Sequence, residues 1–223
     1  MNVALVVVTD GRGEYLQRCW ASLYEMCEYP FSDVIFVDDS GDPAYGEWLM
    51  NTFPPSLLIS HPYRQGLVSS VADAWRAIEH DTEADYVFHV EEDFTFCGPT
   101  PIAEMVDLLK ADPWLAQVVL KRQPWSPEEM AAGGIIEMNP TEYTDHCRLT
   151  DPAHPFWVTH RRLFSLNPCV YPVGITFGGA DGAERGITDR LLADGYHFGI
   201  YGGRHDPPRC LHIGARRSLA WTL

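Results

Sequence analysis

Short apolar runs, each followed at once by acidic residues, constrain the fold of this chain more than any other feature. Three are prominent: Val3 to Val8 before Thr9-Asp10-Gly11, Val34 to Val37 before Asp38-Asp39, and Tyr86 to Val90 before Glu91-Glu92-Asp93. An uninterrupted run rich in β-branched residues is typical of a strand that is buried on both faces of a parallel sheet. The acidic residues therefore fall where strands end.

Helical patterns lie between these runs. Apolar residues recur at helical spacing from Leu16 to Cys27 and from Gly66 to Glu79. Further strands are expected at Leu57 to Ile59, Ala116 to Leu120, Phe156 to Thr159 and, as the last strand, Tyr196 to Tyr201. The alternation over the first 120 residues predicts an α/β fold with an open, mostly parallel sheet flanked by helices.

Two more helices are marked by their ends. Thr100 is the expected N-cap of a helix with Pro101 in its first turn. A helix over Glu184 to Asp194 should stop at Gly195. The stretch from Gln123 to Pro155 is rich in Pro, Gly and acidic residues, and we expect a mobile loop there.

Length and composition predict one domain, with a first half over 1–120 and a second half over 121–223. The 223 residues are 46% apolar, enough to bury a core without disulfides or a structural metal. The six cysteines form no Cys-x-x-Cys pair, so we expect reduced thiols. No apolar run is long enough to span a bilayer and no signal peptide is visible, which favours a soluble cytoplasmic chain.

The net charge limits the partners. Sixteen Lys and Arg against 31 Asp and Glu give a net charge of −15, which opposes binding to nucleic acids and to anionic membranes. A nucleotide ligand would need a local positive charge, from a metal ion or from a few arginines.

The three acidic clusters should converge, because the carboxyl ends of parallel strands meet at one edge of the sheet. Adjacent carboxylates at Glu91, Glu92 and Asp93 repel one another unless something compensates them. Magnesium or manganese, which prefer carboxylate and phosphate oxygens, would do so. The alternative is that each acidic residue only forms a turn or caps a helix.

These motifs, with Arg64-Gln65-Gly66 opening a helix, resemble the nucleotide-binding half of a GT-A glycosyltransferase, closest to the inverting family 2. The resemblance implies that a nucleotide-sugar donor, usually a uridine one, is bound here. It assigns a metal ion, Mn²⁺ or Mg²⁺, first to Asp93 and second to Glu91. Glu91 departs from the usual Asp and can reach the ribose or a water molecule on the metal instead. The donor-binding residues that the resemblance implies are Thr9, Asp10, Arg12, Asp38, Asp39, Arg64, Gly66, Glu91 and Glu92.

The second half resembles the family through the segment from Gly178 to Glu184 and through Leu211-His212-Ile213-Gly214. The family's Glu-Asp pair is broken here, so the general base is assigned to Glu184 or, one turn earlier, to Asp181. Glu184 could instead be an ordinary first-turn acid of its helix. By resemblance His212 closes the metal site, with a structural histidine as the alternative.

Three more residues each have two alternative roles. Arg216 and Arg217 match diphosphate oxygens or form a solvated tail, and Trp125 shapes an acceptor site or anchors a loop. His89 lies within a strand, and we expect it in the core or in contact with the site residues.

The expected activity is transfer of one sugar from a nucleotide-diphosphate donor, a UDP-sugar, to a hydroxyl acceptor on a small molecule, glycan or protein. Inversion at the anomeric carbon follows by analogy alone. One alternative is a nucleotidyltransferase, although no Gly-rich triphosphate loop follows Val8. Another is a non-catalytic nucleotide-sugar or glycan-binding module, which the broken acidic pair would suit. A DNA-modifying enzyme would need a basic groove on its surface.

Overall fold

The computed structural model describes residues 1–122, 140–148, 150–175 and 184–214. Trp125, Asp181, Arg216 and Arg217 lie outside the described residues, as does most of the segment from Gly178 to Glu184. The first half contains β1 (Val3–Thr9), α1 (Gly13–Met26), β2 (Asp33–Asp38), α2 (Pro43–Thr52), β3 (Leu57–Ser60), α3 (Leu67–Asp81), β4 (Tyr86–Glu91), β5 (Phe94–Phe96), α4 (Ile102–Ala111) and β6 (Leu115–Leu120).

The described part of the second half adds further strands, two short 3-10 helices and the helix α6. In chain order they are η1 (Pro140–Glu142), β7 (Tyr143–Arg148), β8 (Asp151–His160), β9 (Cys169–Pro172), η2 (Val173–Ile175), α6 (Glu184–Ala193), β10 (His197–Tyr201) and β11 (Cys210–His212).

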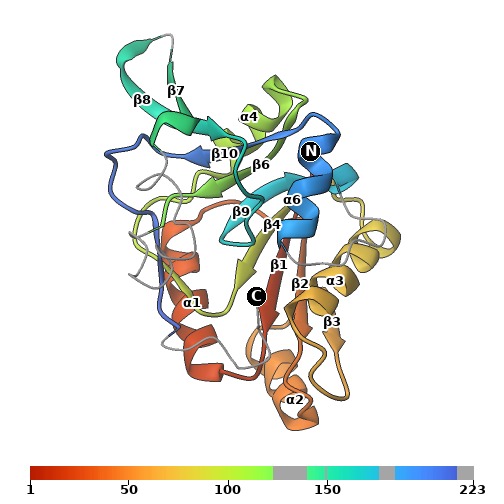
Figure 1. Ribbon diagram of the computed structural model, residues 1–223. Helices are drawn as coiled ribbons and strands as arrows, with labels where there is room; N and C mark the ends of the chain where they lie inside the picture. Colours follow the sequence, from red (N-terminus) through yellow and green to blue (C-terminus); the bar gives the residue numbers. More distant parts are fainter. Residues whose placement is uncertain (123–139, 149, 176–183, 215–223) are drawn as a thin grey trace.

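One nine-stranded sheet, in the order β3-β2-β1-β4-β9-β6-β10-β8-β7, runs through both halves (Figure 1). The strands β1 to β4 are mutually parallel, and β10 is parallel to β6. By contrast, β9 lies antiparallel between β4 and β6, and β7 and β8 form an antiparallel hairpin at the end of the sheet. The predicted α/β fold with an open, flanked sheet is confirmed, and its largest parallel part is formed by β1 to β4.

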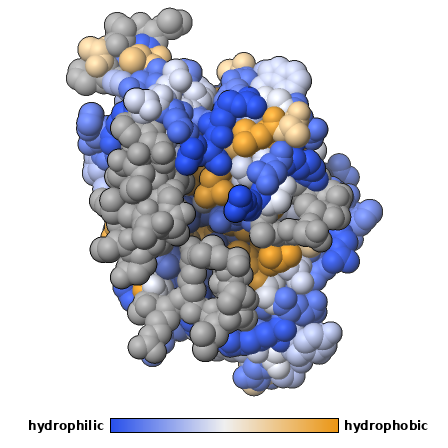
Figure 2. All heavy atoms as spheres, in the orientation of Figure 1, coloured by the Kyte–Doolittle hydropathy of each residue, from blue (hydrophilic) through white to orange (hydrophobic). Residues whose placement is uncertain are grey.

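Both faces of the sheet are covered, as the uninterrupted apolar runs require. Alternate residues of β1 face opposite sides, so Val7 packs with α1, α2 and α4 while Val6 packs with α3 and α6. Burying each large aliphatic or aromatic side chain stabilises the fold by about 1.5–3 kcal/mol. In Figure 2 the visible surface of the described residues is mostly hydrophilic, with apolar patches near its centre.

Strand register brings the predicted clusters to one edge. Thr9 is paired with Asp38 of β2, Val8 with Glu91 of β4, and Asp38 with Ser60 of β3. Residues that directly follow these strands therefore lie side by side, as expected for the carboxyl ends of parallel strands.

The structure differs from the sequence prediction in several elements. The pattern did not reveal α2, β5, β7, β9 or β11, and β10 is not the last strand because β11 follows and pairs with β5. Residues 143–148 and 151–155 of the expected loop belong to the β7–β8 hairpin, and residues 123–139 lie outside the described part. Thr100 does not cap α4, which begins after Pro101 without a side-chain cap.

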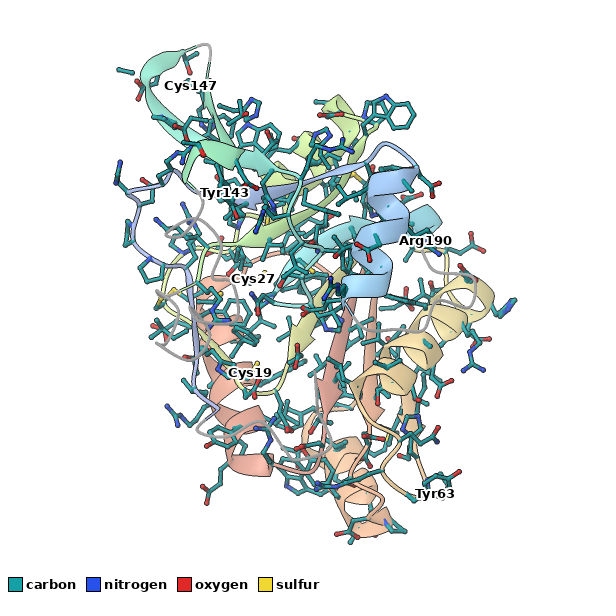
Figure 3. The ribbon with its side chains drawn as sticks, in the orientation of Figure 1. Cys19, Cys27, Tyr63, Tyr143, Cys147 and Arg190 are labelled. Carbon is teal, nitrogen blue, oxygen red and sulfur yellow. The ribbon has the colours of Figure 1, made fainter. Side chains whose placement is uncertain are left out.

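Two further findings concern the whole described chain. None of its helices has both the length and the apolar character that crossing a bilayer requires. All six cysteines are free thiols; Cys19, Cys169 and Cys210 are buried, whereas Cys147 lies on the projecting β7–β8 hairpin (Figure 3).

Candidate functional site

The carboxyl edge of β1, β2 and β4 is lined by buried polar side chains. The six residues Thr9, Asp10, Asp38, Asp39, Glu92 and Asp93 are each at most 9% exposed. Burying a carboxylate is costly unless it is paired and hydrogen-bonded. Five buried carboxyl groups at one edge therefore need specific partners.

Arg12, in the turn between β1 and α1, is the first of these partners. Its Nε lies 2.8 Å from Asp10 Oδ1 and 2.7 Å from Glu92 Oε1, and its Nη2 lies 3.1 Å from Asp93 Oδ2. These carboxylates outweigh the effect of burial and raise the pKa of Arg12, so the guanidinium stays charged. Part of the positive charge that the acidic cluster requires thus comes from a side chain.

The Glu92 side chain is buried and connects the end of β4 to the end of β1 through hydrogen bonds. It contacts the Thr9 hydroxyl, which lies 2.7 Å from the Tyr45 hydroxyl, and it accepts the backbone N–H of Asp10 at 3.2 Å. Burial, reinforced by a hydrogen bond with Asp10, raises the pKa of Glu92 to about 8. Glu92 therefore holds the ends of β1 and β4 together. Its raised pKa favours the neutral form, which reduces the repulsion among the adjacent carboxylates.

Asp93 and His212 meet at the same edge from distant parts of the chain. β11 pairs with β5, which places His212 opposite Phe94, and His212 Nε2 lies 3.3 Å from Asp93 Oδ2. Gly214 passes so close that a Cβ there would lie 2.5 Å from Asp93 Oδ2. Burial alone would raise the pKa of Asp93, but His212 and Arg12 outweigh it and lower that pKa.

The donor atoms here fit a hard divalent cation. Asp93 Oδ1 is buried and has no hydrogen-bond partner among the residues that the structure describes. Magnesium and manganese are often held by one or two protein ligands and complete their shell with phosphate oxygens and water. Within the described ranges, no three His, Cys, Asp or Glu side chains gather as a complete metal site. Asp93 and His212 therefore suit a metal that arrives with a phosphate ligand.

Asp39 is held by the loop between β3 and α3. Its Oδ1 accepts the N–H of Gln65 at 2.7 Å and lies 2.7 Å from His61 Nδ1, and its Oδ2 accepts the N–H of Gly66 at 2.8 Å. Gly66 has a φ of +88°, which favours glycine at this start of α3. The same loop places Arg64, whose Nη2 donates to Asp10 O at 2.8 Å.

Asp38 and Asp39 point to opposite faces, because side chains alternate along an extended chain. Asp38 Oδ1 accepts the N–H of Ser40 at 2.9 Å, and its Oδ2 lies against Gly46 of α2. Asp39, by contrast, lines a narrow cavity of about 10 Å³ together with Arg12, Ser70 and Glu91. Of the two predicted acids, Asp39 faces this cavity, and Asp38 stabilises the turn before α2.

Glu184, the predicted general base, begins α6. Its Oε1 accepts the backbone N–H of Leu166 at 2.7 Å. Ile187 of α6 packs in the same cluster as Val87 of β4, and because side chains alternate along a strand, Glu91 faces the same side of the sheet as Val87. The first turn of α6 is therefore on the side of the sheet that Glu91 faces.

Sequence reasoning missed two residues of this edge, His61 and Asp73. His61 Nε2 lies 3.0 Å from Asp73 Oδ2 on α3. The only available signal was a histidine directly after a short strand. His89 is, as expected, in the core: it is fully buried, and neither ring nitrogen has a hydrogen-bond partner among the described residues.

Comparison with known proteins finds the fold but no sequence relative. No protein-family model matches the chain, and no curated protein matches it. Among solved structures it resembles the mannosyltransferase PcManGT from Pyrobaculum calidifontis, determined in complex with GDP-Man and Mn²⁺, with 18% identity and a TM-score of 0.63. It also resembles S. aureus TarS, with 14% identity and a TM-score of 0.58.

These matches cover 97% and 96% of this chain but only 58% and 60% of the two neighbours, so the chain spans about three fifths of their length. At this identity the likeness establishes the fold. The described chain has the GT-A fold of these glycosyltransferases, as its strand-end motifs indicated.

Proposed function

We propose that this protein is a glycosyltransferase that moves one sugar from a nucleotide-diphosphate donor to a hydroxyl acceptor. The observation that carries the proposal is the gathering of Asp39, Arg12, Asp93 and His212 at the carboxyl edge of a GT-A sheet. In open α/β sheets ligands bind beyond this edge. The PcManGT neighbour, determined in complex with GDP-Man and Mn²⁺, supports the same class of reaction.

The hydrogen bonds of Asp39 favour a uridine donor. Each carboxylate oxygen has two acceptor positions. With His61 and Gln65 on Oδ1 and Gly66 on Oδ2, one acceptor position on Oδ2 is left without a partner among the described residues. Uracil offers a single ring N–H at N3, whereas guanine offers two adjacent donors. One open position therefore suits uracil better, although the donor of the PcManGT complex is GDP-Man.

A bound Mn²⁺ or Mg²⁺ would be held by Asp93 Oδ1 and the His212 imidazole and would neutralise negative charge on the diphosphate. Arg12 holds Asp93 in place through its Nη2 and keeps a permanent positive charge beside it. Glu91, which lines the neighbouring cavity, is placed to contact the ribose or a metal-bound water.

The base of the proposed reaction is Glu184 or Asp181. Its carboxylate takes the proton of the acceptor hydroxyl while the acceptor oxygen bonds to the anomeric carbon. The bond from that carbon to the diphosphate oxygen breaks with its electron pair, so direct displacement inverts the anomeric centre.

A non-catalytic nucleotide-sugar-binding module is the second candidate. One observation favours it: Glu184 Oε1 already accepts a backbone hydrogen bond from Leu166. Release of UDP from a UDP-sugar that disappears in Glu184→Gln, with UDP binding unchanged, would exclude this candidate.

The proposal is tested by calorimetric titration with UDP and then GDP, each with manganese and with excess EDTA. We expect manganese-dependent binding of UDP that is at least tenfold tighter than that of GDP, because one unmatched hydrogen bond to a charged group costs about 1.5–3 kcal/mol. Asp39→Asn should reduce this preference. Equal affinities for the two nucleotides would contradict the assignment of Asp39, and no binding at all would contradict the donor site.

A further inference from the structure

We propose that His61 and Asp73 are positioning residues that fix the Asp39 carboxylate for recognition of the nucleotide base. This inference rests on the proposed function, because it concerns the same donor site. It arises from a buried histidine that lies between two carboxylates from different elements.

The contact geometry is specific. His61 follows β3 and is 6% exposed; its Nδ1 lies 2.7 Å from Asp39 Oδ1 and its Nε2 lies 3.0 Å from Asp73 Oδ2. Each ring nitrogen faces one carboxylate oxygen, so the imidazole connects Asp39 to Asp73 through both of its nitrogens. Arg76 on α3 pairs with Asp73 from the outside.

Because Asp73 anchors the ring to α3, the imidazole cannot rotate without losing one charge-assisted hydrogen bond. The ring in turn occupies one acceptor position of Asp39 Oδ1 and leaves the open position on Oδ2. Asp39 also holds the N–H groups of Gln65 and Gly66, which follow Tyr63 in the loop visible in Figure 3. His61 thus determines which carboxylate edge faces the cavity.

Two conservative variants test the contacts of the two ring nitrogens one at a time. In His61→Asn the side-chain amide nitrogen can replace Nδ1 and keep the bond to Asp39. In His61→Gln the amide nitrogen can replace Nε2 and keep the bond to Asp73 instead. Both variants bury an amide of similar polarity, so a purely structural role predicts similar effects.

The test compares manganese-dependent binding of UDP and of inorganic pyrophosphate, which lacks the base, by calorimetry. We expect His61→Asn to bind UDP within about threefold of the parent protein and His61→Gln to bind it about tenfold or more weakly. Pyrophosphate affinity should stay unchanged in both. His80→Asn, on the exposed end of α3, is the matched control and should behave like the parent.

Equal UDP affinities in both His61 variants, or an equal loss of UDP and pyrophosphate binding, would overturn the inference. Failure of the parent protein to bind UDP would instead overturn the proposed function, so the two failures are distinguishable. If the His61 variants do not fold, Asp73→Asn keeps His61 and tests the anchor alone. It should weaken UDP binding about threefold without affecting pyrophosphate, and an unchanged UDP affinity would overturn the role of Asp73.

Discussion

One side chain, that of Arg12, pairs with three buried carboxyl groups. The sequence predicts that Asp10, Glu92 and Asp93 converge and require a positive charge, and it assigns that charge to a metal ion. In the structure Arg12 binds all three groups, and the raised pKa of Glu92 removes part of the repulsion. Asp93 Oδ1, which is buried without a hydrogen-bond partner in the described part of the chain, is where a metal is still expected.

Removing Arg12 should destabilise the fold. In Arg12→Met three carboxyl groups lose their cationic partner, and we expect a loss of about 2–4 kcal/mol in the free energy of unfolding. This loss is somewhat smaller than that for breaking a fully buried ion pair, because the Arg12 side chain is 28% exposed. Urea unfolding of the variant measures this loss.

Arg18→Met, on the exposed face of α1, is the control and should stay within about 0.5 kcal/mol of the parent. An Arg12→Met protein as stable as the control would show that the carboxyl cluster is compensated by something else.

At this scale sequence reasoning identified the residue types but not their partners. Asp39, Asp93 and His212 were recognised because they match a motif. The contacts of His61 with Asp39 and Asp73 could not be predicted, since they join three elements whose relative distances only the folded chain defines.

At the scale of the elements, strongly periodic segments were predicted well and short ones were not. The strands β1, β2 and β4 have continuous apolar runs because both of their faces are buried. In contrast, β5, β9 and β11 have three or four residues each, too few for a periodic pattern. β11 matters most, because its pairing with β5 brings His212 to Asp93.

The two-sided burial of β4 makes the stability of the fold pH-dependent. His89 lies at its centre, and burial lowers the pKa of this histidine to about 3 from 6.5. The unfolded chain therefore binds a proton below about pH 6.5 that the folded chain does not bind until about pH 3. Stability is fully present above pH 6.5 and falls by up to about 1.4 kcal/mol per pH unit as the pH decreases through this window.

His89→Leu should remove this contribution and also two buried nitrogens without partners among the described residues. Urea unfolding at pH 7 and pH 5 should show a smaller loss of stability on acidification than in the parent. Some dependence should persist, because burial also lowers the pKa of His160 to about 3. An identical pH dependence in parent and variant would contradict the assignment.

At the scale of the whole molecule, charge is distributed unevenly between the two halves. Residues 1–120 contain five Lys and Arg against 20 Asp and Glu, so the entire net charge of −15 falls on the half that carries the candidate donor site. An anionic nucleotide therefore approaches an unfavourable long-range field. Under the proposed function, Arg12 and a bound divalent metal would supply the local positive charge that nucleotide binding at this edge requires.

The central claim is that the edge formed by β1, β2 and β4 binds a uridine diphosphate group together with a divalent metal. A crystal structure of the protein with UDP and Mn²⁺ tests it most directly. The account predicts uracil N3 within hydrogen-bond distance of Asp39 Oδ2, and manganese bound by Asp93 Oδ1, His212 and diphosphate oxygens. Nucleotide bound elsewhere, or manganese bound away from Asp93, would contradict it.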